Sequence, residues 1–570
     1  MQLLLPSSWG PSTHGVPVVV DEQPSSLGPI VSIDIETDEQ DHFVGGCIYD
    51  GGTTLYYFTD GTVFRNLVAG RKIVGYNVKS DLNWLRLMGT TIPSGDIHSD
   101  PMIMAYVVNA NREDQSLKAV AKEVLGWSWP TYREMVGKGK AKQTLDKQAV
   151  EKVAEYCGMD TLAVWRLYVH FDKNFNQGQR KLYDTIELPT YRLLWDMEFK
   201  GINIDTMLLS QLDTDFSKEV RDAEMQLRAY DIMWNPNSPK QSLAILNKNG
   251  VKVGKTDKPT LRLYKGIPIV DHLLTYRKVK KLHSTYVVSL KERNTATIHT
   301  TFNQVAMQDD GSMKGIRTGR LSSSDPNLQN IPAKRKGETY GERLRSMFIP
   351  RQGKVFIDAD YSQIEYRLLA HFSQEASLVQ GFHAGADVHD VTGKLLGCDR
   401  KVGKTLNFAS IYGAGPDKIA DTAGITSGQA QVFLDKYWKV LPQVQRWIDR
   451  TKLLAKSRGG VQTMSGRWIP LPDLASRNKW KRMHAERAAV NYIIQGSAAD
   501  IIKVAMLELK KQGYESVIQV HDELIFEVDP MTAQADLMKI KGIMENVVQL
   551  TVPIIADAHI GGNWQEAKGD

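Results

Sequence analysis

The stretch KVFIDADYSQIEYR, residues 354–367, combines a hydrophobic strand pattern with a cluster of acidic side chains. Because side chains alternate along a β-strand, Asp358 and Asp360 are expected on the same face. Far downstream, SVIQVHDELIF, residues 516–526, is typical of two short strands that meet at a polar turn containing Asp522. Taken alone, an acid at such a turn is most often only a turn residue.

A helix with a functional stripe is predicted between these two segments, in RKVGKTLNFASIY, residues 400–412. Asp399 is expected to cap its start and Gly413 to end it. Every fourth residue lies near the same face of a helix, which aligns two cations and two aromatic residues. They are Arg400, Lys404, Phe408 and Tyr412. An amphipathic helix with two surface cations and two core aromatics would explain the same pattern.

A second acidic pair lies near the start of the chain, in the strand pattern IVSIDIE, residues 30–36. Asp34 and Glu36 are expected on one face, where two close negative charges favour a divalent cation. Such a pair is a weak signal by itself. Two later segments strengthen it: GYNVKSD, residues 75–81, follows a strand, and YCGMD, residues 156–160, lies on a predicted helix.

The organisation of the chain indicates two units. Residues 1–28 are rich in Pro, Ser and Gly, and we expect an extended N-terminal arm. Strand and helix patterns alternate over residues 29–175, which predicts an α/β domain, and residues 176–570 are mostly helical with a small sheet. No secretory signal or membrane-spanning stretch is recognisable. Cys47, Cys157 and Cys398 are far apart, which fits a reducing cytoplasm and disfavours a zinc site.

These segments together resemble DNA polymerases of family A that carry a DnaQ-like 3′→5′ proofreading exonuclease. Further stretches agree with the family: TGRLSS at 318–323, PNLQNIP at 326–332, ERAAVN at 486–491 and QGSAAD at 495–500. The resemblance implies an α/β exonuclease domain of the RNase H-like type, followed by an α+β right-hand polymerase domain. It places the thumb at about 205–300, the palm at about 301–373 and 500–570, and the fingers at about 374–499.

The resemblance also implies roles for the polymerase residues. Asp360 and Asp522 would hold two Mg²⁺ ions, with Mn²⁺ as an alternative, and Lys404 would act in catalysis as well as in nucleotide binding. The expected dNTP contacts are Arg400, Lys404, His389, Phe408, Tyr412 and Glu365, the last excluding ribonucleotides. The expected primer-template contacts are Arg320, Arg487, Asn491, Gln495, His521, Lys280 and Lys281. Glu523 is expected to support the metal site without being a ligand.

For the exonuclease, the resemblance implies that four carboxylates hold two Mg²⁺ ions while Tyr156 orients the attacking water. The carboxylates are Asp34, Glu36, Asp81 and Asp160. The sequence departs from the family at Asp358, Tyr366 and Ala409. Asp358 is a third acid that could be a spare ligand, although a structural role is favoured. Neither Tyr366 nor Ala409 removes a functional group.

The distribution of charge along the chain indicates what kind of molecule the protein binds. Residues 252–293 contain eleven Lys or Arg and three Asp or Glu, so 11 − 3 gives a local charge of +8, and a second basic stretch runs over 477–487. Basic clusters attract phosphates, although many are only solvated faces.

We expect a monomer that binds primer-template DNA and dNTPs, with no membrane partner and no insertion for a processivity subunit. Only about thirty residues precede the first motif, so no 5′ nuclease domain is expected, and the compact length suggests a phage protein working in a bacterial cytoplasm.

Three other functions stay open at this point. A single-subunit RNA polymerase would share the catalytic acids, but Glu365 and a linked exonuclease oppose it. A nuclease whose polymerase half only holds DNA would be expected to lack Asp360, Asp522 or Lys404. A damage-tolerant repair polymerase would be expected to lack the proofreading carboxylates and to contain insertions.

Overall fold

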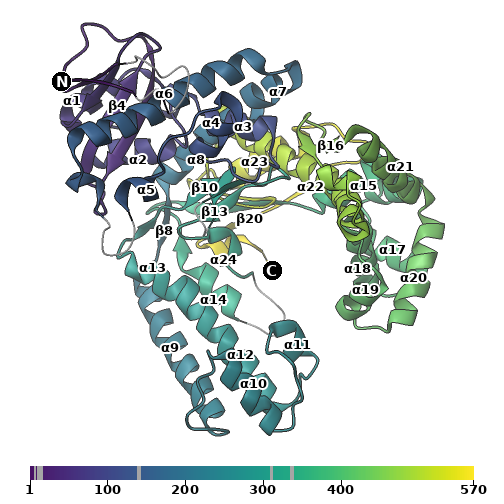
Figure 1. Ribbon diagram of the computed structural model, residues 1–570. Coiled ribbons are helices and arrows are strands. Elements are labelled where there is room, and N and C mark those ends of the chain that lie inside the picture. The colour runs from purple at the N-terminus through teal and green to yellow at the C-terminus, as the bar shows by residue number, and fades with distance from the viewer. Residues whose placement is uncertain (6–7, 9–16, 138–142, 309–311, 334–338, 570) are drawn as a thin grey trace.

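The computed structural model describes residues 1–5, 8, 17–137, 143–308, 312–333 and 339–569 (Figure 1). Its N-terminal unit is built on a seven-stranded sheet with the order β1-β2-β5-β4-β3-β6-β7. In chain order the strands are β1 (Gln2–Leu4), β2 (Pro17–Val20), β3 (Ile30–Thr37), β4 (Phe43–Tyr49), β5 (Leu55–Phe58), β6 (Lys72–Val74) and β7 (Ile97–Ser99). The strand that contains Asp34 and Glu36, β3, lies inside the sheet between β4 and β6.

The N-terminal arm expected over residues 1–28 differs in the structure. Its described residues include β1 and β2, which pair with each other, and β2 also pairs in parallel with β5. Val18 is fully buried, so the hydrophobic run of β2 contributes to the core of the sheet. A four-residue strand is too short to show a sustained period, which explains why the sequence pattern did not reveal it.

Helices cover the sheet of this unit. They are α1 (Gly61–Val68), α2 (Lys79–Leu87), α3 (Pro101–Val108), α4 (Leu117–Leu125), α5 (Tyr132–Val136) and α6 (Val150–Asn174). The helix α6 packs against β3 and β4 and thereby brings Tyr156 and Asp160 to the acidic pair. The hydrophobic core continues beyond the expected domain boundary at residue 175, through α7 (Gln177–Leu182), the π-helical turn η5 (Tyr183–Glu187) and the first half of α8 (Leu188–Lys200).

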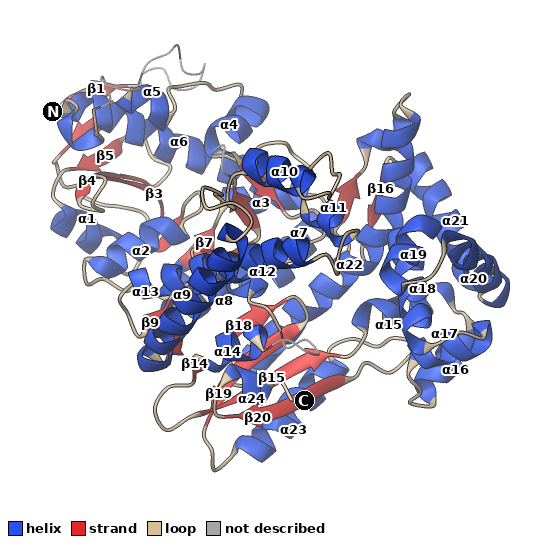
Figure 2. Ribbon diagram, turned by 90° about the horizontal axis from the view of Figure 1, so that it is seen from below, coloured by secondary structure: helices blue, strands red, loops and turns tan. Residues whose placement is uncertain are grey.

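The C-terminal unit is built around a four-stranded antiparallel sheet with the order β18-β19-β15-β20 (Figure 2). The strands are β15 (Val355–Tyr361), β18 (Ser516–Val520), β19 (Glu523–Val528) and β20 (Ala556–Gly561). The predicted strand at 354–361 is confirmed, as are the two strands that meet at His521 and Asp522. In the register of β15 and β19, Asp360 lies opposite Glu523.

Two helical lobes extend from opposite sides of this sheet in Figure 1. One contains α9 (Thr206–Arg228), α10 (Pro239–Lys248), α11 (Lys258–Arg262), α12 (Pro268–Leu282), the π-helical turn η6 (His283–Val288) and α13 (Ser289–Glu292). The other contains α15 (Ile364–Ser373), α16 (Ala376–His383), α17 (Val388–Leu396), α18 (Arg400–Tyr412), α19 (Pro416–Ala423), α20 (Ser427–Val440) and α21 (Pro442–Arg458). The hairpin β16 (Gly460–Gln462) and β17 (Trp468–Pro470) then leads to the long helix α22 (Lys479–Lys511), and α23 (Ala533–Asn546) and α24 (Trp564–Ala567) complete the unit.

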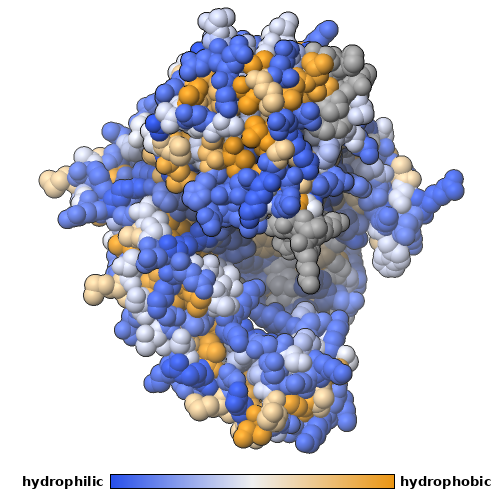
Figure 3. Space-filling view, turned by 60° about the vertical axis from the view of Figure 1, so that its left-hand side comes forward, coloured by the Kyte–Doolittle hydropathy of each residue, from blue (hydrophilic) through white to orange (hydrophobic). Residues whose placement is uncertain are grey.

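The surface is mostly hydrophilic, with hydrophobic residues in separate patches on the face shown in Figure 3. Among the described residues, no helix is both long enough and apolar enough to cross a membrane.

Candidate active sites

The two acids predicted to converge are neighbours at one end of the C-terminal sheet. Asp360 is the penultimate residue of β15, and Asp522 lies in the turn between β18 and β19. The Tyr361 backbone N–H donates to the Asp522 carbonyl at 3.1 Å, which ties the strand end to this turn. His521 has a φ of 57°, in the left-handed region that a tight turn requires. The hairpin therefore brings together two carboxylates that are far apart in the sequence.

The environment of these acids opposes their ionisation. Burial, followed by the charge of Asp360, raises the pKa of Asp522 to about 7. Burial also raises the pKa of Asp360. Two crowded, half-buried carboxylates with raised pKa values are suited to a divalent cation, because the cation offsets both the desolvation and their mutual repulsion. The residues therefore fit the metal that the sequence motif implies.

A lysine that the sequence analysis did not single out lies against this acidic cluster. Lys568 Nζ donates to Asp360 Oδ2 at 2.8 Å and to Glu523 Oε2 at 2.7 Å, and it lies 3.8 Å from Asp358 Oδ1. Although burial alone lowers the pKa of Lys568, the carboxylates of Glu523, Asp358 and Asp360 raise it overall. An ammonium group thus already neutralises part of the negative charge here.

The third acid of β15 is buried deep in the sheet. Asp358 is 2% exposed, and burial followed by the charge of Glu523 raises its pKa to about 9. A carboxyl group with this pKa is neutral at pH 7. These properties agree with the favoured structural role of Asp358. The neighbouring Glu523 also accepts a hydrogen bond from Trp564 Nε1 at 2.9 Å.

The predicted functional helix is α18, with the expected bounds and caps. Asp399 accepts a hydrogen bond from the Val402 backbone N–H, and Gly413 ends the helix with a φ of 61°. Phe408 and Tyr412 are 42% and 39% exposed, which argues against an ordinary amphipathic helix with core aromatics. Arg400, the first residue of α18, forms an ion pair in which its Nη2 lies 2.7 Å from Asp387 Oδ2.

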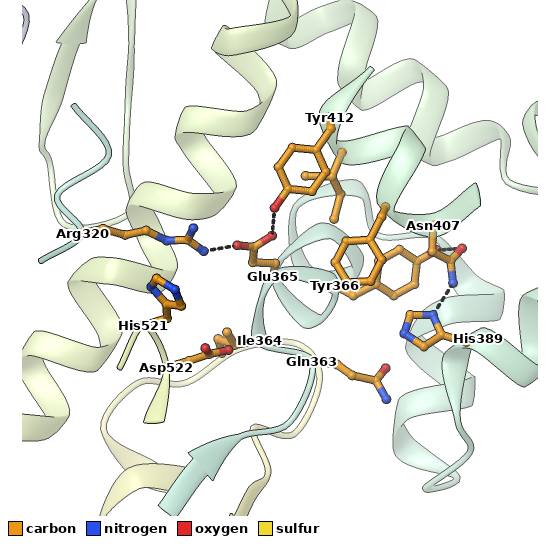
Figure 4. A pocket seen from close by; sticks show the side chains of 12 residues that line it. Arg320, Gln363, Ile364, Glu365, Tyr366, His389, Asn407, Tyr412, His521 and Asp522 are labelled. Carbon is orange, nitrogen blue, oxygen red and sulfur yellow. Dashed lines mark hydrogen bonds and ion pairs between the residues drawn. The ribbon is translucent and has the colours of Figure 1, made fainter. Parts of the chain in front are cut away.

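A cavity of about 190 Å³ lies between α18 and the acidic end of the sheet. Its lining includes seven of the predicted residues, namely Arg320, Glu365, His389, Phe408, Tyr412, His521 and Asp522 (Figure 4). Glu365 is held from two sides: Arg320 forms an ion pair with it, and Tyr412 OH donates to its Oε2 at 3.0 Å. Gln495 Nε2 in turn donates to Tyr412 OH at 3.0 Å.

The unusual Tyr366 belongs to a buried polar network behind this cavity. Its hydroxyl lies 2.6 Å from Asn407 Oδ1, and Asn407 Nδ2 lies 2.9 Å from His389 Nδ1. Figure 4 shows these three side chains in sequence along one wall. Sequence analysis identified Tyr366 as a departure and His389 as a contact, but it missed Asn407, which joins them.

The remaining predicted nucleic-acid contacts fall into two groups. Arg487, Asn491 and Gln495 lie on α22. Gly413, at the end of α18, lies so close to Arg487 that a Cβ added to this glycine would stand 2.7 Å from Arg487 Cδ. This face of α22 therefore packs close to the end of α18. Lys280 and Lys281 lie on α12, in the other lobe and apart from the cavity. The structure therefore gathers the first group near the cavity but not the second.

The exonuclease residues form a second acidic site in the N-terminal unit. The ligand atoms of Asp34, Glu36 and Cys157 all lie within 4.8 Å of one another. Asp81 accepts from the Ile35 backbone N–H at 3.1 Å, which places it beside the same strand. Lys118 Nζ lies 2.6 Å from Asp160 Oδ2 and donates to Tyr156 OH at 3.2 Å. All the predicted residues of this site are therefore brought together.

The electrostatics of this site also suit a divalent cation. Burial, followed by the charge of Asp160, raises the pKa of Asp34 to about 7, and burial is the first cause of the raised pKa values of Glu36 and Asp81. Within the described part of the chain, Asp34 Oδ2 is buried without a hydrogen-bond partner. Such an orphaned oxygen is a free ligand atom.

Three residues of this site were not predicted: Lys118, Trp129 and Cys157. Trp129 Nε1 bonds to Asp160, and Lys118 lies 4.8 Å from the centre of the Trp129 ring. Cys157 was part of the quoted YCGMD segment, but helical spacing from Tyr156 and Asp160 gave no reason to select it. Lys118 and Trp129 come from other elements and had no local signal.

Family models match two ranges of the chain: DNA polymerase family A over residues 206–566, and 3′-5′ exonuclease over residues 54–176. The thermostable DNA polymerase I of Thermus filiformis is 37% identical over 433 residues, which cover 71% of this chain and 50% of the relative. DNA polymerase I of a Synechocystis strain is 34% identical over 540 residues, which cover 86% and 53%. The chain thus spans about half the length of these curated relatives.

A solved structure gives a similar result for the fold. The POL domain of Pol1 from M. smegmatis, in complex with DNA primer-template and dNTP, has a TM-score of 0.81 and 28% sequence identity. The match covers 96% of this chain and all of that one.

Proposed function

The chain belongs to DNA polymerase family A, with an exonuclease domain followed by the polymerase domain, and we propose that it copies a DNA template and proofreads the product. The synthetic reaction joins dNTPs to a primer 3′-hydroxyl, and the second reaction removes nucleotides from the 3′ end. The observation that carries the proposal is the position of Asp522, which lines a cavity together with Glu365, Phe408 and Tyr412. Asp360 lies beside Asp522, because the next residue of its strand, Tyr361, donates its backbone N–H to the Asp522 carbonyl.

In the polymerase site, Asp360 and Asp522 would hold two divalent cations, Mg²⁺ or Mn²⁺. Such ions lower the pKa of a hydroxyl nucleophile and stabilise charge on a departing pyrophosphate. The chain's own task is to hold both carboxylates close together, which the end of β15 and the β18–β19 turn accomplish. Glu523 and Lys568 border this arrangement, with the Lys568 ammonium bonded to both Asp360 and Glu523.

The nucleotide lies along α18. Arg400, Lys404 and His389 bind its triphosphate, because a guanidinium, an ammonium and an imidazole can all donate to phosphate oxygens. Phe408 packs on the sugar and base, and Tyr412 lies by the templating base. Glu365 is held rigidly by Arg320 and Tyr412, so it cannot move aside for a 2′-hydroxyl and thereby excludes ribonucleotides.

DNA occupies the space between the two helical lobes. We assign the lobe of α9–α13 as the thumb, the lobe of α16–α21 as the fingers and the four-stranded sheet as the core of the palm. Arg320, Arg487, Asn491, Gln495 and His521 contact the primer-template close to the cavity, while Lys280 and Lys281 contact the duplex farther away. The protein acts as a monomer without a processivity subunit. The relatives named above are bacterial, and a phage source remains a prediction.

In the exonuclease site, Asp34, Glu36, Asp81 and Asp160 would hold the cations, and Tyr156 would orient the attacking water. Phosphodiester hydrolysis needs an activated water and a stabilised leaving oxygen, which two cations supply. Before a cation binds, Lys118 is the counter-ion of Asp160, and the orphaned oxygen of Asp34 is the first free ligand.

The test uses two alanine variants and a labelled primer-template in Mg²⁺, with and without dNTPs. Asp522→Ala should abolish extension, with a loss of roughly 10³-fold or more, while degradation of single-stranded 3′ ends continues. Asp34→Ala should do the reverse. Asp529→Ala and Asp172→Ala remove exposed acids from the same units and should change neither activity.

Two results would reject the proposal. One is a wild-type protein that neither extends nor degrades DNA, and the other is an Asp522→Ala variant that still extends primers at the normal rate. Parallel reactions with NTPs separate a DNA polymerase from an RNA polymerase, because preferential use of NTPs would contradict the role given to Glu365.

A further inference from the structure

One face of α22 connects the cavity to an exposed tryptophan. Residues 480, 484, 487, 491 and 495 recur at intervals of four, three, four and four, which places them in a narrow stripe along the helix. They are Trp480, His484, Arg487, Asn491 and Gln495. The stripe begins at the cavity, where Gln495 bonds to Tyr412, and it ends at Trp480 in the first turn of the helix.

The outer end of this stripe has an unusual surface. Trp480 is 77% exposed, whereas the other tryptophans of the described chain are buried or half-buried. The side chains of Lys479 and Lys481 are exposed on either side of it. Residues 477–487 contain five Lys or Arg and one acid, Glu486. A large exposed aromatic ring between cations is the composition that sequence-independent single-stranded nucleic-acid sites use.

The position of the ring is fixed by the helix start rather than by a flexible loop. Asn478 caps α22 by accepting hydrogen bonds from the backbone N–H groups of Trp480, at 2.9 Å, and Lys481, at 3.3 Å. From Gln495 to Trp480 the helix rises by about 22 Å, at 1.5 Å per residue. Trp480 is therefore too far away to touch the templating base, and any base that it contacts lies several nucleotides ahead.

We propose that Trp480, with Lys479 and Lys481, forms a binding site for the single-stranded template ahead of the copied position. The indole ring stacks on a template base, and the two ammonium groups contact the adjacent phosphates. Arg487 and Asn491 lie on the path between this site and the cavity. This inference rests on the proposed function, since it assumes that the cavity is where the template is read.

The charge of the surface selects this occupant over a protein partner. A protein docking on an exposed tryptophan would need an acidic surface to match five local cations, whereas a nucleic-acid strand supplies a negative charge with every nucleotide. The stripe is also continuous with the cavity, and a template strand leaving the cavity meets the stripe residues in order.

The experiment compares the affinity of the protein for two primer-templates that share one duplex and differ in the 5′ overhang. One overhang ends just past the templating base, and the other is long enough to reach Trp480. The wild type should bind the long overhang about tenfold more tightly. Trp480→Ala should lose most of this difference, and Trp480→Phe, which keeps an aromatic ring, should retain most of it. Met531→Ala, which truncates another strongly exposed apolar side chain, should behave as the wild type.

A second measurement locates the stacked base. 2-Aminopurine is placed at successive template positions, and its fluorescence should be quenched at one position several nucleotides ahead in the wild type but not in Trp480→Ala. Far-ultraviolet circular dichroism and a thermal melt establish that the variant is folded. Lys479→Gln with Lys481→Gln should lower the salt dependence of binding to the long overhang only.

Equal preference for the long overhang in the wild type and Trp480→Ala would overturn the proposal, as would quenching that persists in the variant. A wild type with no preference would overturn it too. Extension on the short overhang is recorded with the same proteins. If the wild type extends primers but shows no overhang effect, only this inference fails, whereas a wild type that cannot extend any primer rejects the proposed function instead.

Discussion

The acids of both sites are held in conditions that disfavour their charge. Asp34 and Asp522 each have a pKa of about 7, with burial as the largest cause, and Asp358 has a pKa of about 9. A carboxyl group with a raised pKa binds more protons in the folded than in the unfolded state, so its ionisation weakens folding. Ionisation of these acids therefore lowers the stability of the cation-free protein, and a bound cation would offset that loss.

This gives a pH-dependent prediction for Asp522→Asn. In the cation-free protein, the contribution of Asp522 to stability should be most favourable below its unfolded pKa of 3.8 and should be lost as the pH rises to about 7. The melting temperature of the wild type minus that of Asp522→Asn should therefore fall between about pH 4 and about pH 7 and level off above that. Thermal melts in chelator test this, and a difference that rises with pH would contradict it.

A second prediction concerns Lys568. Removing its charge with Lys568→Gln leaves Asp360 and Glu523 without their ammonium partner, so a divalent cation should be attracted more strongly. We expect Mn²⁺ to bind the DNA-free protein about tenfold more tightly. Electron paramagnetic resonance of free Mn²⁺ measures this without any enzymatic assay. Lys511→Gln, at an exposed ion pair, is the matched control, and equal affinities of both variants would show that Lys568 does not compete with the cation.

At the scale of elements, the joint between α22, the β16–β17 hairpin and η5 contains a fully buried charge cluster. Arg467 forms ion pairs with Glu187 and with Asp500, the latter at 2.6 Å, and Lys503 Nζ lies 2.7 Å from Glu187 Oε1. Although burial raises the pKa of Glu187, Arg467 and Lys503 lower it overall to about 2. The two cations and two acids balance, and each depends on the others.

Arg467→Met should therefore be strongly destabilising. It removes one cation from the centre of the cluster and leaves Asp500 and Glu187 with only Lys503 to offset their charge. We expect a loss of about 3–5 kcal/mol in the free energy of unfolding. Denaturant melts measure the loss, with the exposed Arg458→Met as control. A loss no larger than that of the control would mean that the cluster contributes little.

Sequence patterns predicted the elements that their own residues determine. The strand at 354–361 and the helix α18 with its caps follow from local alternation, spacing and capping. The π-helical turn η6 between α12 and α13 has no marker in the residue pattern. The partners of Asp160 and the cluster of Glu187, Arg467 and Lys503 were also missed, because Glu187 is 280 residues from Arg467 and only tertiary packing brings them together.

At the scale of the whole molecule, one helix belongs to two hydrophobic cores. The first half of α8 packs with the N-terminal unit, and its Leu193, Leu194 and Met197 pack with the C-terminal unit. Lys79 of α2 reinforces this joint by bonding to Glu198 and to the Phe302 carbonyl. Tyr106 of α3 donates to the Ile316 carbonyl at 2.7 Å.

The shared helix predicts coupled unfolding of the two units. Differential scanning calorimetry of the wild type should give a single transition, because neither core can lose α8 without exposing part of the other. Arg467→Met should lower this transition and separate it into two. Two well-separated transitions in the wild type would contradict the prediction, and the Arg458→Met control should leave the single transition unchanged.

The joint around α8 has a consequence for the error correction proposed above. Because the two acidic sites are fixed on one scaffold, a mispaired end cannot be reached by swinging one domain toward the other. The primer strand itself has to separate from the template and move from one site to the other. The frequency of correction would then depend on how easily the last base pairs melt, so that AT-rich ends are edited more often than GC-rich ends even when they are correctly paired.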